Sequence, residues 1–171
     1  MMSAHESVWT KCLRFRKLPS AERKLVLRAM LFLALTKAGL RCVGFRRWKQ
    51  TIEYFLRVVP GRRGLEPAAQ LVIAEGIARA ARSAERHGPA APNCLERSLA
   101  LWWLLRREGI DAELQIGASK SESRFEAHAW VELGGVVLND TADVHSHYAR
   151  FDAPIAAAEA ESRAAGEAAS R

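Results

Sequence analysis

The sequence predicts an α+β fold, in which helices come first and a small antiparallel sheet follows. Two observations lead to this prediction. As far as residue 109 the apolar residues recur with the 3.6-residue period of helices, and from residue 110 they alternate with polar residues as in strands. The chain has 171 residues, of which 49% are hydrophobic, so it is long and apolar enough to bury a core without disulfides or metals.

Four helices are expected, at residues 21–39, 45–59, 67–86 and 94–108. Pro67 suits the first turn of the third helix, and Gly109 is placed to close the fourth. The fourth helix carries many apolar residues, including Trp102 and Trp103. It is therefore predicted to be the central helix of the core.

The strongest boundary in the sequence is the Pro- and Gly-rich stretch 60–64. We therefore divide the chain into a helical N-terminal region (1–64), a core (65–152) and an Ala/Glu-rich tail (153–171). The tail has no large apolar residue after Ile155, so a weak helix or a disordered end is expected there.

Strands are expected at residues 110–116, 125–133 and 136–140, with a turn at the two glycines 134 and 135. In the second strand, His128 lies on the face opposite the aliphatic residues. A two-residue turn would place Asp140 opposite Ala129. A three-residue connection with a bulge would place Asp140 directly across from His128, and a His–Asp pair therefore predicts that bulge.

Cys94 is the first candidate for chemistry. Asn93 and Glu96 have the spacing of a capping box, which puts Cys94 in the first helical position. Unpaired N–H groups and the helix dipole favour a thiolate there. The alternative is a small buried cysteine with no chemical role.

His128 and Asp140 are the other two candidates. An imidazole facing Cys94 would be the base that deprotonates it, and Asp140 would orient that imidazole. A structural histidine is the alternative for such a strand position. His145 and His147 resemble a metal pair, but they lack a third ligand at a suitable spacing, so they are expected in a solvated loop. Neither a metal nor a cofactor site is predicted.

Several classes of protein are excluded or disfavoured. Three widely spaced cysteines (Cys12, Cys42 and Cys94) do not suit a secreted disulfide framework, so a cytoplasmic protein is expected. The most apolar run, residues 29–35, is far too short for a membrane span, and no transmembrane segment is predicted. A phosphate-binding glycine loop is also missing.

Charge is unevenly distributed. Residues 1–66 contain 15 Lys and Arg against four Asp and Glu, whereas the rest of the chain is slightly acidic. Solvated helix faces are the simplest explanation, and the alternative is a surface that meets nucleic acid, an anionic membrane surface, a partner protein or an acidic peptide. A nucleic-acid binder would present more aromatic residues among the basic ones than Trp48 and Tyr54, so nucleic acid is not an expected partner.

Three segments together resemble a known family: CLERSLAL from Cys94, AHAWVE at 127–132, and LND ending at Asp140. In this order and spacing they are similar to the transglutaminase-like, papain-like cysteine-protease core. More narrowly, they resemble the leader peptidases of lasso-peptide biosynthesis, the maturation protein B family. The similarity is strong over residues 93–140 and loose in the helical N-terminal region.

The resemblance implies a cysteine peptidase that removes the leader from a ribosomally made lasso-peptide precursor. It assigns Cys94 as nucleophile, His128 as general base and acid, and Asp140 as the residue that orients the histidine. It also implies a macrolactam cyclase resembling asparagine synthetase as a partner. Because residues 1–66 are predicted to be helical, the split form is expected, with leader recognition by a separate winged-helix-type protein.

Two other functions remain open at this point. A transglutaminase-like enzyme would transfer the acyl group to an amine, through the same acyl-enzyme. A non-catalytic module of the same shape would only present a peptide to a partner enzyme.

Overall fold

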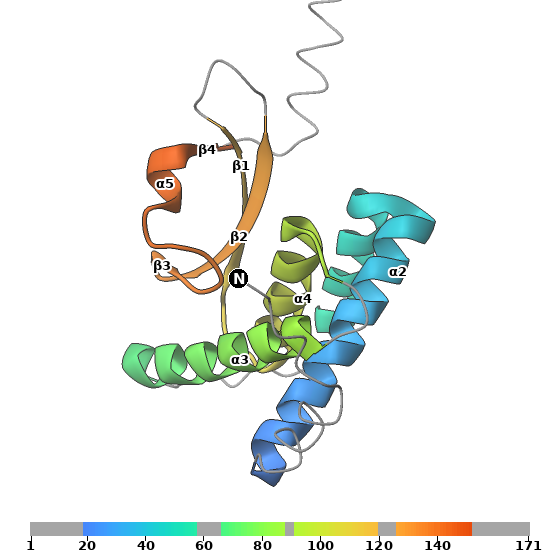
Figure 1. Cartoon of the computed structure of the whole chain (residues 1–171), viewed down its shortest axis with the longest axis vertical. Coiled ribbons are helices and arrows are strands. Elements are labelled where there is room, and N and C mark those ends of the chain that lie inside the picture. The colour runs from blue at the N-terminus through green and yellow to red at the C-terminus, as the bar shows by residue number, and fades with distance from the viewer. Residues whose placement is uncertain (1–18, 58–65, 88–90, 120–125, 152–171) are drawn as a thin grey trace, which may run out of the picture.

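The computed structural model describes residues 19–57, 66–87, 91–119 and 126–151 (Figure 1). Its elements are, in order, α2 (Ser20–Arg57), α3 (Pro67–His87), α4 (Cys94–Arg107), β1 (Glu113–Ser119), β2 (Ala127–Leu133), β3 (Val136–Val137), α5 (Val144–His147) and β4 (Tyr148–Arg150). Helices thus precede a small antiparallel sheet, which confirms the predicted α+β class. The predicted boundary at 60–64 and the tail 153–171 lie outside the described residues.

Helix α2 differs from the two helices that the sequence predicted. The break lies at Gly44, with φ 77° and ψ 171°, and the predicted end near Gly39 is wrong. Gly39 is buried within the helix because the indole of Trp48 packs against it. A Cβ at residue 39 would lie 2.1 Å from Trp48 Cδ2. Glycine is therefore needed at 39 for close packing, and at 44 for a backbone conformation that other residues rarely adopt.

Helix α4 is the centre of the core, as predicted. Leu99, Leu101 and Leu105 are almost completely buried, and the helix packs against α2, α3 and the sheet. Its Trp103 ring meets Phe32 of α2, with ring centroids 4.1 Å apart. Trp102 donates from Nε1 to the carbonyl of Ala112 at 3.1 Å. The Trp103 indole thereby joins α4 to α2, and the Trp102 indole joins α4 to the segment just before β1.

The sheet has the strand order β3-β2-β1-β4, and every pair is antiparallel. Figure 1 shows α4 on one side of it and α5 on the other. Both faces of β2 are therefore covered, so Val131 on one face and Trp130 on the other are fully buried.

The strand boundaries differ from those predicted. β1 starts at Glu113 because the segment before it packs in the core without pairing to a strand. Strand β4 and helix α5 were not predicted, since three and four residues are too few to give a period. His145 and His147 belong to α5, so the loop expected for them is wrong. None of the described helices is long and apolar enough to cross a membrane.

The hairpin between β2 and β3 has a two-residue turn. Leu133 pairs with Val136, and Glu132 pairs with Val137. The two turn residues, Gly134 and Gly135, have φ angles of 56° and 83°, as a type I′ turn requires. The three-residue connection that a His–Asp pair predicted is therefore wrong.

Candidate active site

Cys94 is the first residue of α4, as predicted from its neighbours. The backbone N–H of Glu96 donates to Asn93 Oδ1 at 2.8 Å, and the N–H of Asn93 donates to Glu96 Oε2 at 3.1 Å. This reciprocal capping box fixes where the helix begins. Cys94 has a free, half-buried thiol and lies at the end of the helix where the box leaves first-turn N–H groups unpaired.

His128 and Asp140 form a hydrogen-bonded pair. Nε2 of His128 lies 2.5 Å from Oδ2 of Asp140, and the two side chains are 15% and 22% exposed. Burial raises the pKa of Asp140, but the hydrogen bonds from His128 and from the backbone N–H of Thr141 outweigh it. The charge of Arg97 acts in the same direction, so the net pKa lies below its ordinary value. Asp140 is therefore a carboxylate at neutral pH, and His128 is the donor.

The pair forms although the turn places Asp140 out of register with His128. The reason is that the β2–β3 ladder ends early. Leu138 still donates its N–H to Val131 at 2.9 Å, but the N–H of Val131 donates to the side-chain Oδ1 of Asn139 at 2.8 Å. The carbonyl of Leu138 accepts from Arg82 of α3 at 2.8 Å. The chain thus leaves the strand at Leu138 and turns the Asp140 carboxylate toward His128.

Ser98 ties together the three segments that carry the candidate residues. It is fully buried on α4, one turn after Cys94. Its hydroxyl donates to the carbonyl of Ala129, next to His128, at 2.7 Å. The same oxygen accepts from Nδ2 of Asn139, next to Asp140, at 2.8 Å. One hydroxyl therefore fixes the helix, the strand and the loop relative to one another.

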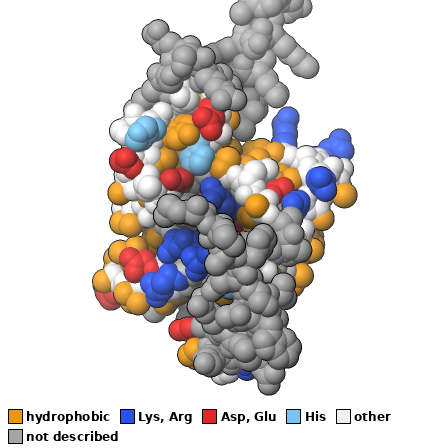
Figure 2. Space-filling model, in the orientation of Figure 1, with side chains coloured by type: hydrophobic (Ala, Val, Ile, Leu, Met, Phe, Trp, Pro, Cys, Tyr) orange, Lys and Arg blue, Asp and Glu red, His pale blue; other side chains and the backbone are white. Residues whose placement is uncertain are grey.

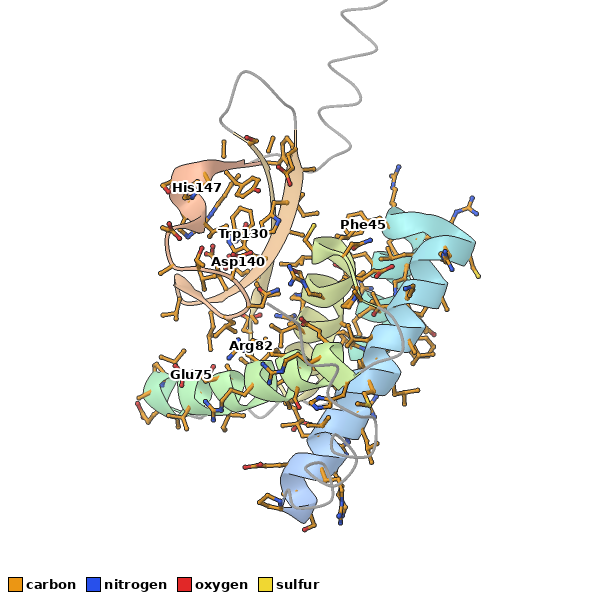
Figure 3. All side chains as sticks on the ribbon, in the orientation of Figure 1. Phe45, Glu75, Arg82, Trp130, Asp140 and His147 are labelled. Carbon is orange, nitrogen blue, oxygen red and sulfur yellow. The ribbon has the colours of Figure 1, made fainter. Side chains whose placement is uncertain are left out.

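A group of aromatic and charged side chains covers the face of β2 that carries His128. The Tyr148 ring stacks on the imidazole, with centroids 4.6 Å apart, and Trp130 lies 6.2 Å away on the same strand. Trp130 Nε1 donates to the buried carboxylate of Glu132, which also accepts from Arg150 at 2.6 Å. Figure 3 shows Trp130 and Asp140 between β2 and α5, with Arg82 of α3 nearby.

The surface around this pair is mixed in charge. Figure 2 shows histidine and acidic side chains together over the sheet and α5, and basic side chains grouped over α3. The His145 side chain is 39% exposed, and it lies 3.2 Å from Glu132 and against the Trp130 ring. Among the described residues, no three His, Cys, Asp or Glu side chains are grouped closely enough to hold a metal ion.

The structure brings His128 and Asp140 together directly, and connects Cys94 to them through Ser98. Within the described segments, no hydrogen bond joins the Cys94 thiol to the imidazole. Cys94 lies at the start of α4, the helix that packs on β2.

Residues 32–152, well more than half of the chain, match a family described as the transglutaminase-like superfamily. The chain belongs to that superfamily. This membership confirms the transglutaminase-like fold class that the motifs around Cys94, His128 and Asp140 implied.

A shorter match relates this transglutaminase-like chain to the microcin J25-processing protein McjB of Escherichia coli. The two are 46% identical over 48 residues, which make up 28% of this chain and 22% of McjB. Most of the length of McjB therefore lies outside the match. The chain matches no solved structure.

Three residues of the site were missed by the sequence analysis. Ser98 and Asn139 lie inside the segments that indicated the family, but their roles depend on contacts between distant segments. Tyr148 lies in a strand too short to predict. The one available signal was a serine flanked by the apolar run of α4, because a buried hydroxyl needs a partner.

Proposed function

We propose that this chain is a cysteine peptidase that removes the leader from a lasso-peptide precursor, with Cys94 as nucleophile. His128 is the general base and acid, and Asp140 orients it. The observation that carries the proposal is the hydrogen bond between His128 Nε2 and Asp140, beside the helix that starts at Cys94. Membership of the transglutaminase-like superfamily and the local similarity to a microcin-processing protein support it.

The bond to Asp140 determines which nitrogen of His128 can act. Because Asp140 is ionised, Nε2 carries the proton that it donates. In the neutral ring, Nδ1 then has the free lone pair. Nδ1 is therefore the atom that accepts the thiol proton of Cys94, which gives a thiolate and an imidazolium.

The reaction then has two halves. The Cys94 thiolate attacks the carbonyl carbon of the leader–core peptide bond, and the first-turn N–H groups of α4 stabilise the oxyanion that forms. The imidazolium of His128 gives its proton to the leaving amine, which becomes the N-terminus of the core peptide. Water, deprotonated by the neutral His128, attacks the thioester and releases the leader with a new carboxylate.

The partners follow from the same proposal. The precursor is the substrate, a separate winged-helix-type protein binds the leader, and a cyclase resembling asparagine synthetase closes the ring. All act in the cytoplasm. The exposed Arg46 and Arg47 of α2 are candidates for the docking surface. If Arg46→Glu/Arg47→Glu binds the leader-recognition protein as tightly as wild type, the docking surface lies elsewhere.

The test is cleavage of the precursor encoded beside this protein, with the leader-recognition protein present, followed by mass spectrometry. Cys94→Ala is compared with Cys42→Ala, which changes an exposed cysteine of α2. His128→Ala is compared with His147→Ala, whose side chain is 64% exposed. We expect cleavage at one leader–core bond by wild type and both controls, and none by the two site variants.

The other outcomes identify the alternative functions. Cleavage by Cys94→Ala would exclude Cys94 as the nucleophile. Accumulation of an amine-linked product in place of the free acid would indicate acyl transfer. Binding of the precursor without cleavage, with the cyclase also present, would indicate a presenting module.

A further inference from the structure

Tyr148 makes a ring contact with His128 that sheet geometry alone would not give. Tyr148 pairs with Ser119 of β1, and His128 pairs with Gly117 of the same strand. The two residues are thus on strands that do not touch, separated by β1. Their rings nevertheless stack, with centroids 4.6 Å apart and planes 24° from parallel.

Gly117 makes this contact possible. It lies between His128 on β2 and Arg150 on β4, and paired residues project on the same face of a sheet. A Cβ at residue 117 would lie 3.0 Å from Trp130 Cη2 and 2.5 Å from the carbonyl oxygen of Ala149. With no side chain at this position, Trp130 and the backbone of β4 close over β1, the strand that separates the two rings.

The imidazole of His128 has one hydrogen bond, from Nε2 to Asp140. The ring can still tilt by rotation about its Cβ–Cγ bond, because one hydrogen bond at Nε2 tolerates a range of angles. Tilting moves Nδ1, the atom on the other side of the ring. The flat contact with Tyr148 removes this freedom, because the imidazole cannot tilt without striking the phenol ring.

We infer that Tyr148 is a positioning residue, whose ring holds the plane of His128 so that Nδ1 faces Cys94. This inference rests on the proposed function, in which His128 takes the proton of Cys94. It assigns the effect to the ring of Tyr148 and not to its hydroxyl group.

The surroundings of Tyr148 keep its phenol group neutral. Partial burial raises the pKa of Tyr148, and the negative charges of Glu126, Asp140 and Cys94 raise it further. The phenol is therefore neutral wherever the enzyme would work. It adds no charge beside an imidazole that must gain and lose a proton.

The experiment compares Tyr148→Phe, which keeps the ring, with Tyr148→Leu and Tyr148→Met, which fill the space without a ring. Tyr54→Leu is the control, because Tyr54 is exposed on α2. Two quantities are measured: the kcat and KM for precursor cleavage, and the pH dependence of Cys94 alkylation by iodoacetamide, read by peptide mass mapping. Circular dichroism checks that each variant is folded.

We expect Tyr148→Phe and Tyr54→Leu to behave as wild type. Tyr148→Leu and Tyr148→Met should lower kcat by about 10- to 100-fold with KM unchanged, as a misplaced catalytic group does. They should also slow Cys94 alkylation at mildly acidic pH, since the thiolate loses its imidazolium partner.

Two results would overturn the inference. Either the ringless variants match wild type in both measurements, or Tyr148→Phe is as impaired as Tyr148→Leu, which would assign the role to the hydroxyl. Alkylation needs no substrate, so it tests the inference even if wild type fails to cleave the precursor. Failure to cleave would count against the proposed function alone.

Discussion

His128 and Asp140 are joined through Nε2 at 2.5 Å, and this contact forms outside the ladder of the sheet. Its geometry therefore does not depend on strand register. It depends on Asn139, because the Asn139 side chain accepts the N–H of Val131 where a backbone carbonyl would otherwise continue the ladder. It also depends on Ser98, which holds the Asn139 side chain against α4. Residues that touch no substrate thus decide where the Asp140 carboxylate points.

Asp140→Asn should abolish most of the activity without unfolding the protein. An amide can present its NH₂ group to Nε2, which would move the ring proton to Nδ1, the nitrogen that must accept from Cys94. We expect kcat for precursor cleavage to fall by about 10³- to 10⁴-fold. Asp143→Asn, in the exposed part of the same loop, should keep wild-type activity. A loss of only a few-fold in Asp140→Asn would show that the carboxylate does not set the tautomer.

Removal of Ser98 or Asn139 should cost both stability and activity. Ser98→Ala leaves the half-buried Asn139 amide and the Ala129 carbonyl short of a partner, and Asn139→Ala leaves the N–H of Val131 unpaired. Each change should lower the free energy of unfolding by about 1–3 kcal/mol, measured by urea denaturation. Activity should fall as well, because the loop that carries Asp140 is released.

The double variant Ser98→Ala/Asn139→Ala tests whether the two side chains act together. Their bond predicts a coupling of about 0.5–3 kcal/mol in a double-mutant cycle. Ser146→Ala is the control, since the Ser146 hydroxyl bonds only within its own exposed helix turn. Additive effects of the two substitutions would mean that the Ser98–Asn139 bond contributes nothing.

Local patterns predicted the elements that local forces determine. The capping residues around Cys94 gave the start of α4, and alternation along β2 gave the face of His128. Both signals lie within a few residues of sequence. The family resemblance gave the fold class, which the superfamily match confirms.

Contacts between distant segments were beyond those patterns. Helix α2 breaks at Gly44 and not near Gly39. Gly39 stays inside the helix because Trp48 packs against it, and the sequence pattern gives no signal for this contact. Asp140 was expected to reach His128 by a bulged turn, yet the turn is regular and Asn139 diverts the chain instead. A side chain that ends the hydrogen-bond ladder between two strands does not change the periodicity of the sequence. The path that brings Asp140 to His128 could therefore not be predicted.

Gly117→Ala should destabilise the protein, because the new methyl group would meet the Ala149 carbonyl and the Trp130 ring. The backbone of β4 cannot yield as a flexible side chain can, so we expect a loss of about 1–3 kcal/mol. Gly76→Ala in α3 is the matched control. Its nearest contact would be Arg79 Nη2 at 3.8 Å, and alanine in a helix interior should add about 0.5–1 kcal/mol. Thermal melting of both variants measures the two opposite shifts.

Asp140 should stabilise the fold at neutral pH and lose this effect in acid. Its hydrogen bonds to His128 and Thr141 outweigh burial and hold its pKa below 3.8, the ordinary value. A carboxyl group whose pKa is lower in the folded state stabilises the fold at any pH above its pKa in the unfolded state. This stabilisation is lost as the pH falls through the pKa of the folded state. The urea midpoints of wild type and Asp140→Asn should therefore differ at neutral pH, and the difference should begin to shrink once the pH falls below about 4.

Glu85 provides the control, because its shift has the opposite sign. Burial raises the pKa of Glu85, and the charges of Arg97, Arg82 and Arg86 only partly oppose it. Ionisation of Glu85 therefore lowers the stability of the fold as the pH rises. From acid to neutral pH, the stability of Glu85→Gln relative to wild type should increase, whereas that of Asp140→Asn should decrease. Urea midpoints measured from about pH 3 to pH 7 compare the two slopes. Parallel curves for wild type and Asp140→Asn would mean that the His128–Asp140 bond does not stabilise the folded state.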